Sequence, residues 1–134
     1  KTALKTLQDR TNHYLSLLHL SGLEFNINEI PLHSLGSDEI TLTLASTPLQ
    51  KVSSGELNRI RLASLAAKSE FIQKDGGVLI LDEIDANLSG KESMSVATVL
   101  EVLAKTYQIF AISHQPQLSS RAHMHFLVYK EDGV

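Results

Sequence analysis

An uninterrupted apolar run that ends at two carboxylates constrains the fold of this chain more than any other feature. Residues 78–81 read Val-Leu-Ile-Leu, and Asp82 and Glu83 follow directly. An apolar run without alternation is typical of a strand that is buried on both faces of a parallel sheet. Ligands of such sheets bind beyond the carboxyl ends of the strands, where this acidic pair would emerge. The pattern therefore predicts an α/β fold with a ligand site at the end of this strand.

Size and composition limit the possible functions. The 134 residues, of which 43% are hydrophobic, suffice for one compact domain with its own core. The net charge of −3 gives no global basic field, so a DNA contact would be local or made by another part of a longer protein. The chain has no cysteine, which excludes disulfides and thiolate metal sites. No apolar stretch approaches the roughly 18 residues that span a bilayer, so we expect no membrane partner.

Helical and strand patterns alternate along the chain, as in α/β proteins. Helical periodicity predicts helices over residues 1–22, 53–71 and 89–105, with a short irregular or helical stretch at 116–121. Apolar runs and alternation predict strands over residues 23–27, 40–44, 78–81, 107–113 and 125–130. The first two strands, separated by a turn over 31–38, are expected to form an antiparallel pair. We therefore divide the chain into an N-terminal helix, 1–22, and an α/β lobe, 23–134.

The helix at residue 53 begins with Ser53, Ser54, Gly55 and Glu56. Ser53 and Glu56 have the spacing of a capping box. A helix N-terminus offers free backbone N–H groups and a partial positive charge, and Gly55 would let a phosphate approach closely. An ordinary capped helix has the same four residues, so this tetrapeptide alone leaves both interpretations open.

Three further side chains are candidates for chemistry at the strand ends. Asp82 could hold Mg²⁺, which prefers hard oxygen ligands, and Glu83 could act as the general base that activates a water. His114 follows the apolar strand 107–113 and could hydrogen-bond a γ-phosphate or that water. One helix separates the two strands, so a right-handed crossover would bring Glu83 and His114 to the same sheet edge. The alternative is that these residues merely end strands in solvent.

In this order, these motifs resemble the C-terminal lobe of an ABC-type ATPase head of the SMC-like class. The resemblance makes 53–56 the signature motif, Asp82 and Glu83 the Walker B pair, 85–90 the D-loop and His114 the switch histidine. The Leu-Ser-Gly ending of 85–90 departs from the usual SMC Leu-Asp but is similar to RecN-type bacterial DNA repair ATPases. The run His-Gln-Pro-Gln-Leu from residue 114, and His-x-His before the last expected strand, also resemble that family.

The resemblance implies a mostly parallel sheet flanked by helices, and ATP and Mg²⁺ as cofactors. It implies that Ser53, Ser54, Gly55, Glu56 and Asp85 contact the nucleotide. It also implies a homodimeric second head, DNA as a partner of the full-length protein, and a cytoplasmic location at the bacterial nucleoid. The implied function is ATP-gated head dimerisation in recombinational repair of double-strand breaks. Residues 1–22 would then end a coiled-coil arm.

No Gly-x-x-x-x-Gly-Lys-[Ser/Thr] motif occurs in these residues. In the resembled family the P-loop lies on an N-terminal lobe, which would be a further partner from the same protein. Because Lys1 is not Met, we expect the chain to be part of a longer protein, and we expect the piece alone to be inactive. The alternatives are another SMC-like head (Rad50-type or RecF-type), a transporter ATPase subunit, or a non-catalytic α/β interaction module.

Overall fold

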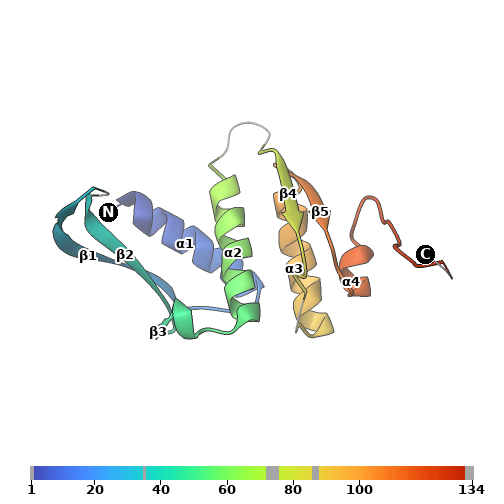
Figure 1. Ribbon diagram of the computed structural model, residues 1–134, viewed down its shortest axis with the longest axis horizontal. Helices are drawn as coiled ribbons and strands as arrows, with labels where there is room; N and C mark the ends of the chain where they lie inside the picture. The colour runs from blue at the N-terminus through green and yellow to red at the C-terminus, as the bar shows by residue number, and fades with distance from the viewer. Residues whose placement is uncertain (1, 35, 72–75, 86–87, 132–134) are drawn as a thin grey trace.

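The computed structural model describes residues 2–34, 36–71, 76–85 and 88–131 (Figure 1). An antiparallel hairpin lies at one end of the molecule, three helices occupy the centre, and a small parallel sheet lies toward the other end. Elements of both kinds alternate along the chain, which confirms the predicted α/β class. None of the helices in the described part of the chain is long and apolar enough to cross a membrane.

The N-terminal helix α1 (Thr2–Leu17) ends earlier than its expected limit at residue 22. The chain reverses just beyond it, where His19 has a φ of 57° and Gly22 a φ of 80°. The side-chain amide of Asn12 then fixes the entry to the first strand, because it donates to the carbonyl of Leu23 at 2.7 Å and accepts from the Leu23 N–H at 3.0 Å. This pair of hydrogen bonds ties α1 to the hairpin.

The predicted antiparallel pair is present as β1 (Leu23–His33) and β2 (Gly36–Leu44), with a short third strand β3 (Thr47–Pro48). The predicted turn over 31–38 was too long, because the two strands continue to His33 and from Gly36. Pro31 is tolerated there because it lies in the irregular stretch of register between Glu29 and His33, where the hydrogen-bond ladder is interrupted.

A short 3₁₀ turn, η1 (Leu49–Lys51), leads to α2 (Ser54–Ser69). The predicted capping box of Ser53 with Glu56 begins α2, and a second one, Ser89 with Glu92, begins α3 (Gly90–Leu103). Each helix ends two residues before its expected limit. The largest fully buried apolar side chains come from α1, the turn after it, the start of β1 and α3: Leu15, Leu18, Leu23, Val96, Val99 and Leu103. Helix α2 adds small fully buried side chains, those of Ala63, Ala66 and Ala67.

Polar contacts near both ends of α2 join it to the C-terminal half of α1 and to the residue after that helix. Near one end, the buried Tyr14 hydroxyl donates to Glu70 Oε1 at 2.7 Å, and Arg10 forms an ion pair with the same carboxylate at 3.2 Å. Near the other end, Arg59 Nη1 donates to the carbonyl of Leu18 at 3.1 Å. Helix α2 is therefore connected to the α1 segment at two separate points along its own length.

The parallel strands are β4 (Val78–Leu81) and β5 (Gln108–Ala111). The expectation that strand 78–81 is buried on both faces was wrong. Leu79 and Leu81 pack against the core, whereas the side chain of Ile80 is 77% exposed and Val78 is also exposed. The physical reason is that the described helices cover only one face of this sheet. The apolar pattern of β4 suits a strand with two buried faces, but only one of its faces is covered.

The predicted strand over 125–130 was also wrong. After the short helix α4 (Pro116–Ser119), residues 122–131 form no strand, and the apolar side chains of Phe126, Leu127 and Val128 are exposed. The sequence carries strand propensity there, but a strand forms only when its backbone pairs with a neighbour. No described strand pairs with these residues.

Candidate functional site

The acidic pair and the histidine leave the same edge of the parallel sheet. Leu81 is in register with Ala111, and the Ile112 N–H donates to the Leu81 carbonyl at 2.8 Å. Asp82 and Glu83 therefore follow one strand, and His114 follows its neighbour, at the same end. The structure shows this juxtaposition; the chemical roles assigned to the three residues stay predictions.

The side chains of Asp82, Glu83 and His114 are exposed and make no hydrogen bond or ion pair with any other described residue. Unpartnered side chains at a sheet edge are available to an external ligand.

Glu83 has a left-handed backbone, with a φ of 50°. A residue with a Cβ adopts this conformation at a cost, and such residues occur often at functional sites. The turn that it creates directly after β4 leads the chain inward, so that Asp85 is buried only two residues later. Glu83 and Asp85, two positions apart, thus have opposite surroundings, since the first is exposed and the second is buried.

Asp85 is 3% exposed, and one of its carboxylate oxygens holds the loop that contains His114. Oδ2 accepts from the backbone N–H groups of His114 and Gln115, both at 3.0 Å, and from the hydroxyl of Ser113. We call these four residues the Asp85 clasp. The sequence prediction placed Asp85 among the nucleotide contacts; in the structure its carboxylate faces the loop that carries His114.

A second contact ties the same loop to Leu88, three residues beyond Asp85. Gln115 Nε2 donates to the carbonyl of Leu88 at 3.3 Å. The loop after β5 is therefore fixed both to Asp85 and to Leu88, directly before the N-cap of α3. Sequence reasoning missed this pairing, because nothing local to residues 113–115 indicates a buried carboxylate partner.

The predicted phosphate-binding turn lies at the start of α2. Glu56 Oε2 accepts from the Ser53 N–H at 2.9 Å and from its hydroxyl at 2.8 Å, and the Glu56 N–H donates back to Ser53 Oγ at 3.2 Å. The Ser53 backbone N–H, followed by its hydroxyl, lowers the pKa of Glu56. A Cβ added at Gly55 would meet no atom within 4 Å, so internal packing does not require glycine there. The open space suits the approach of an external group.

Arg59 connects this turn to the turn that begins α3. Its Nε donates to the Gly55 carbonyl at 3.3 Å, and its Nη1 forms an ion pair with Glu92 at 3.0 Å. The Arg59 side chain is only 11% exposed. The N-terminal ends of α2 and α3 consequently lie at the same end of the molecule as the carboxyl ends of β4 and β5 (Figure 1). An arginine on the inward side of a helix was the available signal, and the sequence reasoning did not use it.

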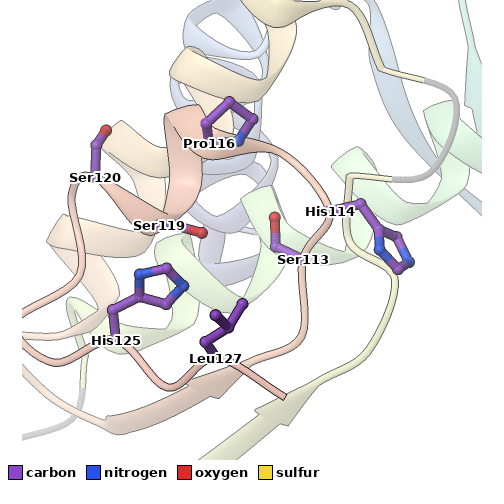
Figure 2. A pocket seen from close by; sticks show the side chains of 7 residues that line it. All are labelled: Ser113, His114, Pro116, Ser119, Ser120, His125 and Leu127. Carbon is purple, nitrogen blue, oxygen red and sulfur yellow. The ribbon is translucent and has the colours of Figure 1, made fainter. Parts of the chain in front are cut away.

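A shallow pocket adjoins the His114 loop (Figure 2). It is lined by Ser113, His114, Pro116, Ser119, Ser120, His125 and Leu127. The rings of His114 and His125 lie apart, and the His114 ring points away from the rest of the lining. Within the described ranges, no group of three or more His, Asp or Glu side chains could hold a metal ion. Asp82 would fit Mg²⁺ as a single carboxylate ligand, because that ion is commonly bound by one or two carboxylates with phosphates and water.

Comparison with solved structures places the fold. A structure from a study of ATP-driven dimerisation and DNA-stimulated activation of SMC ATPases matches 99% of this chain and 82% of its own, with a TM-score of 0.65 and 21% identity. An Smc head with an extended coiled coil, bound to the C-terminal domain of ScpA, from Pyrococcus furiosus, matches 88% of this chain and 30% of its own, with a TM-score of 0.65 and 20% identity. At these identities the likeness shows the fold, and the fold is that of an SMC-type ATPase head lobe.

Sequence comparison identifies the family within that class. No protein-family profile matches the chain. DNA repair protein RecN of Helicobacter pylori strain J99 is 44% identical over 106 residues, which are 79% of this chain and 20% of that protein. RecN of Haemophilus influenzae is 34% identical over 115 residues, 81% of this chain and 20% of that protein. The chain belongs to the RecN family, and it spans about one fifth of the length of these relatives.

Proposed function

We propose that this chain is the C-terminal lobe of the ATPase head of a RecN-type repair protein. The observation that carries the proposal is the edge shared by Asp82, Glu83 and His114, three exposed side chains without partners in the described structure. The match to RecN sequences and the SMC-type fold support the same assignment.

In this proposal the sheet edge faces the phosphates of ATP. Asp82 would hold Mg²⁺, which when bound neutralises phosphate charge. Glu83 would accept the proton of the attacking water, and His114 would hydrogen-bond the γ-phosphate or that water. The exposed positions of all three agree with these roles, since each side chain can reach a ligand without breaking an internal contact.

The start of α2 would meet a nucleotide held by a second head. Ser53, Ser54, Gly55 and Glu56 form an exposed to half-buried helix N-terminus with open space above Gly55. The free N–H groups and the positive end of the helix dipole there suit a phosphate. Two heads would then enclose ATP between them, and hydrolysis would release them.

A P-loop lobe of the same protein would complete the pocket. The outer face of the parallel sheet supports this, because Val78, Ile80, Phe110 and Ile112 leave an apolar surface exposed there. Exposed apolar patches of this kind mark contact surfaces. A covering lobe would also restore the two-sided burial for which the sequence of β4 is suited.

For the whole protein we propose ATP-gated head dimerisation during recombinational repair of DNA double-strand breaks in the bacterial cytoplasm, at the nucleoid. The net charge of this chain is −3, so DNA would bind chiefly to other parts of the protein. The curated relatives are named DNA repair proteins, which supports the cellular role.

The test is Glu83→Gln in the full-length protein. The change keeps size and hydrogen bonding but removes the proposed base, so ATP turnover should fall by about 100-fold or more, and ATP should trap the dimer on size-exclusion chromatography. Glu39→Gln, at an exposed position of the hairpin strand β2, is the matched control and should behave as wild type. Wild-type turnover by Glu83→Gln would refute the role of Glu83 and favour a non-catalytic module.

A further inference from the structure

The Asp85 clasp joins the loop after the acidic strand to the loop of the switch histidine. Asp85 lies two residues beyond Glu83, and its Oδ2 accepts three hydrogen bonds from residues 113–115. Two of the donors are the backbone N–H groups of His114 and its neighbour. The carboxylate thus fixes the main chain that carries the imidazole, without touching the ring.

The surroundings of Asp85 make this contact hard to replace. The carboxylate is almost completely buried, and its other oxygen, Oδ1, has no hydrogen-bond partner among the described residues. A buried carboxylate needs donors to offset its desolvation, and the three donors to Oδ2 supply them. Loss of the loop contacts would leave the charge without any described partner, so the clasp and the buried state of Asp85 depend on each other.

We propose that Asp85 is a positioning residue that sets the place of His114 relative to Glu83. This inference rests on the proposed function, because it concerns the same reaction. Asp85 acts through the backbone of residues 113–115, so it need not contact nucleotide itself. The Glu83 turn and the His114 loop then move as one unit, since Asp85 belongs to the first and holds the second.

The kinetic test uses the full-length protein with Asp85→Asn, His114→Ala and the double variant. Asp85→Asn keeps the shape of the side chain but removes the charge. Misplacement of a catalytic group by a fraction of an ångström lowers kcat, here by roughly 10- to 100-fold, with little change in the KM for ATP. In the His114→Ala background, Asp85→Asn should cause less than a twofold further loss, because the residue on which it acts is gone. Asp38→Asn, an exposed hairpin position, is the control and should leave kcat unchanged.

Hydrogen–deuterium exchange supplies a readout that is independent of activity. The peptide containing residues 113–115 should exchange at least tenfold faster in Asp85→Asn than in the wild type, because two N–H groups lose a charged acceptor. Ser113→Ala removes only the hydroxyl donor, so it should show a smaller loss of kcat in the same direction. This second variant keeps the proposal testable if Asp85→Asn does not fold.

The possible results separate this inference from the function on which it rests. Unchanged exchange in Asp85→Asn, or a loss of kcat that multiplies fully with that of His114→Ala, overturns the positioning role while the ATPase assignment stands. If His114→Ala and Glu83→Gln both turn over ATP as the wild type does, the proposed function fails, and this inference fails with it.

Discussion

The left-handed backbone of Glu83 allows stability and function to be separated at one residue. An L-residue in this conformation costs about 1–2 kcal/mol relative to the right-handed region, whereas glycine adopts it freely. Glycine also gives the unfolded chain more freedom, which offsets about 0.4–1 kcal/mol. The Glu83 side chain makes no hydrogen bond or ion pair with a described residue, so its removal breaks no internal contact. Glu83→Gly should therefore raise the free energy of unfolding by roughly 0.5–1 kcal/mol.

For a chain of this length that gain corresponds to an increase in Tm of about 2–4 °C. Calorimetry or circular dichroism on the 134-residue chain measures it. Glu83→Gln keeps the Cβ and should leave Tm unchanged while it removes the proposed base. Ala45, with a φ of 47°, is a second left-handed position and lies far from Glu83 in the sequence, and Ala45→Gly should give a similar increase in Tm. Asp82→Gly, outside the left-handed region, should lower Tm. A lower Tm for Glu83→Gly would refute the reasoning.

Three further results are expected. Burial and the hydrogen bond to Glu70 raise the pKa of Tyr14 to about 12, above its unfolded value near 10. The contribution of the protonated Tyr14 hydroxyl to stability is therefore complete below pH 10 and is lost as the pH rises toward 12. In urea denaturation at alkaline pH, Tyr14→Phe should not show this loss of stability. Ser89→Ala should lower the free energy of unfolding by about 1 kcal/mol. The Ser89 N–H and hydroxyl hold the pKa of Glu92 below its usual value, so the stabilisation that they give is lost when the carboxylate is protonated below about pH 4. Because Ser89→Ala removes the hydroxyl, the variant should lose less stability on acidification than the wild type. Acid denaturation curves of the two forms check this. The 134-residue chain alone, which lacks a P-loop motif, should bind no ATP in isothermal titration calorimetry, and clear binding would contradict the two-lobe proposal.

Sequence reasoning succeeded where the signal was local. The capping boxes at Ser53 and Ser89 involve residues three positions apart, so their spacing alone predicts them. The common edge of β4 and β5 followed from one intervening helix between two apolar runs. These features do not depend on distant parts of the chain.

The features that sequence reasoning missed depend on distant residues. Asp85 meets its donors 28 to 30 positions away, and Arg59 meets Glu92 across 33 positions. The exposed face of β4 and the unpaired residues 125–130 were mispredicted for a related reason. Their side chains have the pattern of buried strands, but burial depends on the elements that cover them, and the described helices cover only one face.

The two-point connection between α1 and α2 has a mechanical consequence. Glu70 anchors one end of α2 to α1 through Tyr14 and Arg10, and Arg59 anchors the other end through the Leu18 carbonyl. Because α2 contacts the α1 segment at two separate points, it cannot rotate about either contact alone. A rotation of α1 would therefore be transmitted to the whole of α2, and it would move the residues at the start of that helix, Ser53 to Gly55.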